Sequence, residues 1–93
     1  MDLFLSFLAG MFAINSIPHL VQGVSGKPFR TPFVRLSGTK QSGPVVNVAW
    51  GWFNAAVAYA LAYHATADFS LMAFALGTLL MGLAMAMIFA GDH

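Results

Sequence analysis

Three long stretches without a charged side chain limit what this chain can fold into. They cover residues 3–26, 41–67 and 69–91. Each holds the roughly 20 mainly apolar residues that an α-helix, rising ~1.5 Å per residue, needs to cross ~30 Å of hydrocarbon. Lipid offers no partners to backbone N–H and C=O groups, and the alternation typical of barrel strands is absent, so each span must be a helix. The sequence predicts an all-α integral membrane protein with three transmembrane helices, near residues 3–24, 45–65 and 69–90.

The composition supports this class. The 93 residues are 59% hydrophobic and 8% charged, whereas an ordinary soluble domain carries about 25% charged residues. The chain has no Cys, no Glu and a net charge of +1. These features argue against a disulfide-bonded secreted domain, a cysteine zinc site and a nucleic-acid-binding protein. No repeat or low-complexity tract divides the chain, so residues 1–93 are expected to form one transmembrane domain in the lipid bilayer.

The basic residues predict the orientation of the chain. All four lie between the first two spans, at Lys27, Arg30, Arg35 and Lys40. Since loops rich in Lys and Arg stay in the cytoplasm, we expect this connector inside, the N-terminus outside and the C-terminus inside, in a cytoplasmic (inner) membrane. No Lys or Arg precedes Lys27, whereas a cleaved signal peptide opens with basic residues. The first span is therefore expected to be retained.

The 20 residues 24–43 form a connector rich in Gly, Pro and basic residues. Pro28 and Pro32 argue against a long regular helix. Phe29 and other apolar side chains lie among the cations, which is typical of a segment on a membrane surface. The cations expected to contact lipid headgroups are Lys27, Arg30, Arg35 and Lys40. Pro44 suits the first turn of the next helix.

Polar side chains in the first span are candidates for a functional site, because placing them in hydrocarbon is costly. Asn15, His19 and Gln22 follow one another at helical spacing and share one face. Pro18 leaves the carbonyl of Ile14 without its helical partner and is expected to kink the helix beside this face.

The second span carries a matching polar face, formed by Asn47, Trp50 and Asn54. Counted from the cytoplasmic boundary, Asn15 and Asn54 both lie about 13.5 Å inside the membrane by the helical rise. We therefore expect the two polar faces to meet, with His19 between Asn47 and Asn54.

Two interpretations of these polar residues stay open. Asn and His side chains pair across membrane helices at about 0.6 kcal/mol each, which is enough to fix a register without any functional site. Alternatively, they form a site for a headgroup, an ion, a proton or a small solute. The residues of that candidate site are Asn15, His19, Asn47, Trp50 and Asn54.

No metal site or cofactor is expected. The sequence contains no His, Asp or Glu cluster with metal-ligand spacing, and the predicted topology places His19 and His64 at opposite membrane faces. His64 stands beside Tyr59 and Tyr63, where an interfacial belt of aromatic residues belongs. The spacing does not distinguish an interfacial His64 from one that ligates haem or a pigment.

The third span is rich in small residues, which allow membrane helices to approach closely. Ala73 and Gly77 form one small-residue ridge, and Ala75, Thr78 and Gly82 form a second. Two neighbouring helices of one chain cannot fully use both ridges, so one is expected to remain for a partner.

Enzymatic chemistry is not expected. The acidic residues Asp2, Asp68 and Asp92 lie at the termini or in a turn, and a nucleophile needs an oriented base beside it. The sequence favours an accessory or assembly subunit that acts by helix packing in a homo-oligomer or a larger membrane complex. The alternative is an oligomeric channel or transporter for a small solute or ion, lined by Asn15, His19, Asn47 and Asn54.

Overall fold

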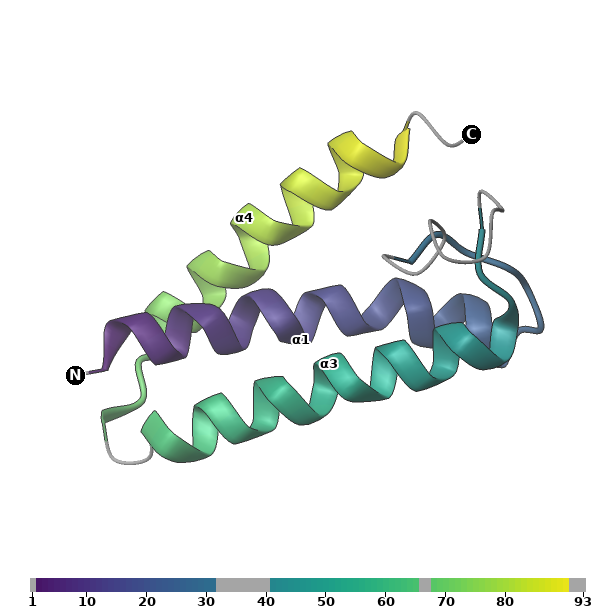
Figure 1. The fold of residues 1–93 in the computed structure, drawn as a ribbon. Coiled ribbons are helices and arrows are strands. Elements are labelled where there is room, and N and C mark those ends of the chain that lie inside the picture. Colours follow the sequence, from purple (N-terminus) through teal and green to yellow (C-terminus); the bar gives the residue numbers. More distant parts are fainter. Residues whose placement is uncertain (1, 32–40, 66–67, 91–93) are drawn as a thin grey trace.

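The computed structural model of the chain describes residues 2–31, 41–65 and 68–90 (Figure 1). The regular elements in these ranges are three helices: α1, Leu3–Val24; α3, Pro44–Ala65; and α4, Leu71–Ala90. Each is long and apolar enough to cross a membrane, which confirms the predicted all-helical class with three helices of spanning length. The helix ends lie within two residues of the predicted ones.

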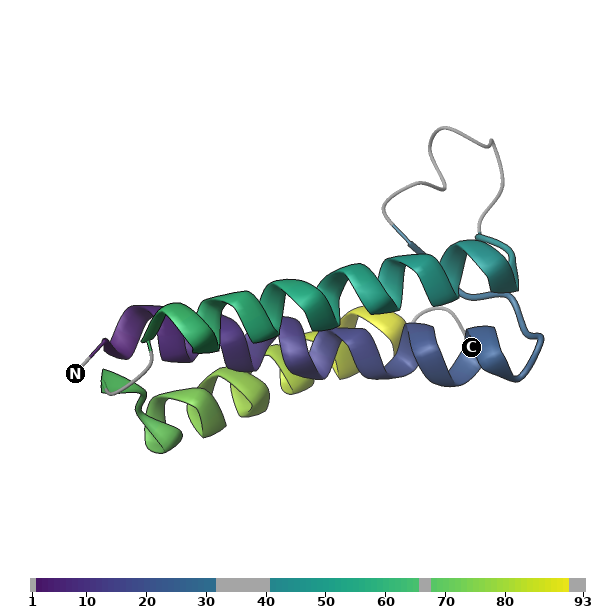
Figure 2. The same cartoon turned by 90° about the horizontal axis from the view of Figure 1, so that it is seen from below.

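Helix α1 lies between the other two helices (Figure 1 and Figure 2). Helix α3 runs antiparallel to α1, whereas α4 starts beside the N-terminal end of α1 and diverges from it toward its own C-terminus. Within the described residues α1 packs extensively against both neighbours, and α3 and α4 do not pack extensively against each other. The position of α4 is therefore set mainly by α1.

Two glycines bring α1 and α4 into backbone contact. A Cβ atom on Gly10 would collide with the carbonyl oxygen of Phe74, and one on Gly77 would collide with that of Phe7. Only a residue without a side chain permits this approach. Ala73 is also buried. The predicted Ala73/Gly77 ridge is thus used within the chain.

The second predicted ridge is not used in this way. Ala75 is exposed, and Thr78 and Gly82 are partly buried. A Cβ atom on Gly82 would lie 3.8 Å from Cγ1 of Ile14, an ordinary contact distance. At this level α4 has already moved away from α1 (Figure 1).

Serines and an aspartate join the ends of α1 and α4 near the N-terminus. Oδ1 of Asp2 accepts a hydrogen bond from the backbone N of Leu5 at 3.0 Å, which caps α1. The Ser6 hydroxyl donates to the Asp2 carbonyl at 2.8 Å and accepts from the backbone N of Ser70 at 2.9 Å. Oγ of Ser70 in turn accepts from the backbone N of Ala73 at 3.1 Å. This cap explains why α4 begins at Leu71 and not at the predicted residue 69.

The other end of α1 turns sharply into the connector. Gly26 adopts a φ of 73°, a left-handed conformation that favours glycine. Its backbone N donates to the Gly23 carbonyl at 3.0 Å, and the backbone N of Lys27 donates to the Gln22 carbonyl at 2.9 Å. These two bonds form a Schellman motif, which ends the helix and satisfies its last carbonyl groups.

Glycines also let α1 and α3 approach closely. A Cβ atom on Gly51 would lie 2.7 Å from Cγ of Leu20, and one on Gly23 would lie 2.8 Å from the carbonyl oxygen of Pro44. The close approach along this pair allows polar side chains of the two helices to reach each other.

Candidate polar site between α1 and α3

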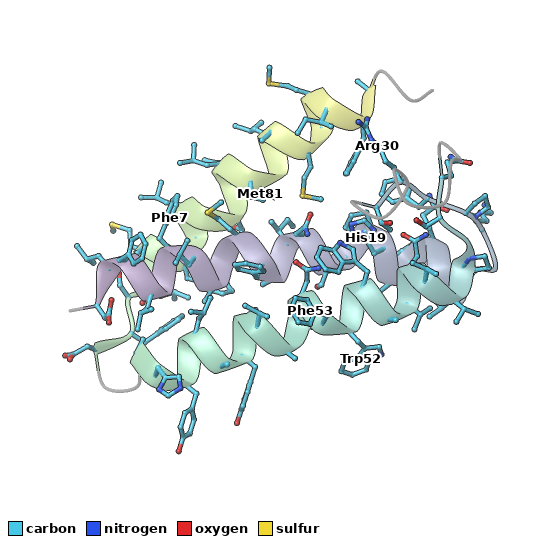
Figure 3. All side chains as sticks on the ribbon, in the orientation of Figure 1. Phe7, His19, Arg30, Trp52, Phe53 and Met81 are labelled. Atoms are coloured by element: carbon cyan, nitrogen blue, oxygen red, sulfur yellow. The ribbon has the colours of Figure 1, made fainter. Side chains whose placement is uncertain are left out.

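Asn47 is the centre of a buried hydrogen-bond network where α1, α3 and the connector meet; Figure 3 labels His19 at this place. The Nδ2 atom of Asn47 donates to the carbonyl oxygens of Phe29, Ser42 and Gly43, each at 3.0 Å. Its Oδ1 lies 2.9 Å from Nδ1 of His19. Two amide hydrogens serve three acceptors, so at least one hydrogen is shared.

The network determines which ring nitrogen of His19 carries a hydrogen. Three carbonyl oxygens surround one side of the Asn47 amide, so that side must be Nδ2. Oδ1 of Asn47 then faces His19 and can only accept, so Nδ1 of His19 donates.

A second polar pair lies farther along the same two helices. Nδ2 of Asn15 donates to Oδ1 of Asn54 at 2.9 Å. Nδ2 of Asn54 donates to the carbonyl oxygen of Trp50, one turn earlier in α3, at 2.8 Å. The structure thus contains the Asn15–Asn54 contact that equal depth predicts, and of the two asparagines expected beside His19 it is Asn47 that bonds to the ring.

Most of the candidate residues are enclosed by protein. The exposed fraction is 2% for His19, 0% for Asn47 and 1% for Asn54, whereas Asn15 and Trp50 are partly buried. Trp50 takes part through its backbone carbonyl, and its ring stacks on Phe53 with centroids 5.4 Å apart. Within the described part of the chain, no buried side-chain nitrogen or oxygen lacks a hydrogen-bond partner.

Three described residues of the connector, Phe29, Thr31 and Ser42, are buried in the protein, so the expectation that Phe29 reaches the membrane interface is wrong. The Phe29 side chain is buried. Its ring lies edge-on to that of His19, with centroids 5.4 Å apart, and to that of Phe89 on α4, with centroids 4.9 Å apart. The sequence gives no sign of this, because it does not reveal that Asn47 offers donors to the connector backbone.

An isolated antiparallel bridge joins the two ends of the connector. The backbone N of Phe29 donates to the Ser42 carbonyl at 3.0 Å, and the backbone N of Ser42 donates to the Phe29 carbonyl at 2.8 Å. The buried hydroxyls of Thr31 and Ser42 also bond to each other. Periodicity alone cannot predict such a bridge, because each side contributes only one residue.

The predicted headgroup contacts fall partly within the described residues. Lys27 and Arg30 are exposed. Arg35 and Lys40 lie outside the described residues.

At the opposite end of the molecule, His64 is exposed among aromatic rings. Its ring lies edge-on to that of Tyr63, with centroids 5.9 Å apart, and Tyr63 stacks with Tyr59 at 6.3 Å. In residues 2–31, 41–65 and 68–90, no three His, Asp or Glu side chains are grouped so that they could hold a metal ion.

No protein-family profile, curated protein or solved structure matches this chain.

Proposed function

We propose that this protein is an accessory or assembly subunit that acts through helix packing, in a homo-oligomer or in a larger membrane complex. The observation that carries the proposal is how the polar groups are used. His19, Asn47 and Asn54 bond to other groups of the same chain. The exposed side chains of α3 and α4 are mainly apolar.

The packing of α4 supports this function. Only Ala73, Gly77 and Met85 of its 20 residues are buried. In a membrane such a helix contacts lipid or other helices over most of its length, and small exposed residues such as Ala75 permit close approach. We place the protein in a cytoplasmic membrane, with the N-terminus outside and the C-terminus inside, and with Lys27, Arg30, Arg35 and Lys40 near lipid headgroups.

The channel alternative has less support. A pathway for ions or solutes needs polar groups that face water and exchange partners with the permeating species. The enclosed His19, Asn47 and Asn54 bond instead to groups of their own chain. Asn15 is less enclosed, but its amide nitrogen is bonded to Asn54.

Two-tag purification from membranes tests the assembly function. Two copies of the chain with different affinity tags are expressed together and extracted in mild detergent, and the mass of the purified particle is measured by light scattering. We expect the particle to contain more protein than one 9.9 kDa chain. Recovery of both tags together indicates a homo-oligomer, and other proteins in a fixed ratio to one tag indicate a larger complex. A particle with one copy and no other protein, also found by counting subunits in native vesicles, would refute the proposal.

A further inference from the structure

Helix α4 is held against the rest of the protein at its two ends. At the N-terminal end, Gly10 and Gly77 bring the backbones of α1 and α4 together, and Ser6 bonds to Ser70. Beyond this crossing α4 diverges from α1 (Figure 1), and Gly82 is no longer in close backbone contact.

At its C-terminal end, α4 is held by its contact with the ring of Phe29. This ring lies between the two diverging helices, edge-on to His19 of α1 at 5.4 Å and to Phe89 of α4 at 4.9 Å. Phe29 belongs to neither helix. The connector therefore puts an aromatic side chain into the wide end of the space between α1 and α4.

The position of Phe29 is itself determined by α3. Nδ2 of Asn47 donates to the Phe29 carbonyl, and the bridge to Ser42 fixes the same residue from the other end of the connector. Thus α3 holds the connector backbone, and the Phe29 ring of the connector contacts α4. In the described residues α3 and α4 do not pack extensively against each other.

We propose that Phe29 is a wedge that sets the angle between α1 and α4, and that the Asn47 network couples α3 to α4 through this wedge. The crossing at Gly10 and Gly77 acts as the fulcrum. Any partner or ligand that displaces the connector then changes the tilt of α4. This device is independent of the proposed assembly function.

Spin-label distances test the wedge, and the chain contains no cysteine that would interfere. Nitroxides are attached at Val21→Cys and Ile88→Cys, whose native side chains are 55% exposed in both cases, and the distance between them is measured by pulsed electron paramagnetic resonance in vesicles. A second labelled pair, Leu3→Cys and Leu71→Cys, reports on the opposite end of the two helices.

In the Phe29→Ala variant we expect α4 to close on α1, toward the interaxial separation of about 8–10 Å that directly packed helices adopt. The Val21/Ile88 distance then shortens and the Leu3/Leu71 distance stays unchanged. Asn47→Ala is expected to shorten the same distance, since it removes the bond from α3 to the Phe29 carbonyl and leaves only the bridge to Ser42. Trp52→Ala, which removes an exposed ring from α3, is the matched control and is expected to change neither distance.

Phe89→Ala keeps the test decisive where Asn47→Ala does not fold, because it removes the contact from the α4 side and leaves the connector network intact. An unchanged or longer Val21/Ile88 distance in Phe29→Ala and Phe89→Ala would refute the wedge. An Asn47→Ala protein with native helicity is folded. If such a protein kept the native Val21/Ile88 distance, the coupling to α3 would be refuted.

Discussion

Asn47 shows how much of this fold depends on a single polar side chain. The carbonyl groups of Phe29, Ser42 and Gly43 each accept from a backbone N–H, that of Ser42, Phe29 and Asn47 respectively, and the Asn47 side chain adds a second donor. The Asn47 amide meets all three, and its oxygen accepts from His19. These bonds attach the connector backbone to the Asn47 side chain of α3.

The first prediction concerns His19. Nδ1 of His19 donates to Asn47, and Nδ1 is bonded to Cγ, as is Nδ2 of an asparagine side chain. We expect His19→Asn to keep this hydrogen bond and to lose stability only through the missing ring. His19→Leu leaves Oδ1 of Asn47 without a donor and is expected to cost about 1–3 kcal/mol more than His19→Asn. The free energy of unfolding in lipid or detergent, measured by steric trapping, checks this difference.

Combining each His19 variant with Asn47→Ala provides the control for this prediction. If the hydrogen bond is the cause, the difference between His19→Asn and His19→Leu disappears once Asn47 is removed. A difference that persists in the Asn47→Ala background would mean that side-chain shape and not the hydrogen bond decides stability.

At the scale of the helices, the second prediction concerns the two glycines of α4. Gly77→Ala places a Cβ atom against the Phe7 carbonyl, so the helices must separate, and we expect a cost of about 1–3 kcal/mol. Gly82→Ala is the matched change on the same helix. Its Cβ atom would lie 3.8 Å from Ile14, so it is expected to be neutral or slightly stabilising. Thermal unfolding midpoints of the two variants in one detergent check the difference. Equal midpoints would show that α1 and α4 do not cross at Gly77.

The helices themselves could be predicted because membrane thickness fixes their length and the charged residues mark their ends. The α1–α3 register could also be predicted, since equal depth in the membrane pairs Asn15 with Asn54. The partner of a small-residue ridge could not be predicted. Gly77 stands on an identifiable ridge, but nothing in its spacing shows that the ridge meets Gly10 of the same chain.

The connector was beyond prediction for a different reason. Phe29 among cations resembles an interfacial residue, and its burial depends on backbone hydrogen bonds to Asn47, whose side chain lies 18 residues away in sequence. Backbone acceptors are present at every residue, so the sequence does not show which of them an amide will select.

At the scale of the whole molecule, the third prediction concerns the surface that contacts other proteins. Helix α4 buries the fewest residues within the chain, so we expect it to form the interface. Ala75→Trp on α4 is expected to raise the dissociation constant of the assembly at least tenfold, which corresponds to about 1.4 kcal/mol. Ala56→Trp, at an exposed alanine of α3, is the control and is expected to leave assembly unchanged. Cross-linking in native membranes measures both. Loss of assembly for Ala56→Trp alone would place the interface on α3.

The fourth prediction concerns the direction in which the chain crosses the membrane. Its four basic residues all lie between the first two helices, and the two that the structure describes, Lys27 and Arg30, are exposed. Since basic loops stay in the cytoplasm, Gln41→Cys should react with a membrane-impermeant maleimide only in inverted vesicles. Asp68→Cys, at an exposed position between α3 and α4, should react in intact cells. The cysteine-free native chain controls for background labelling. The reverse labelling pattern would contradict the proposed orientation and would place the connector outside the cell.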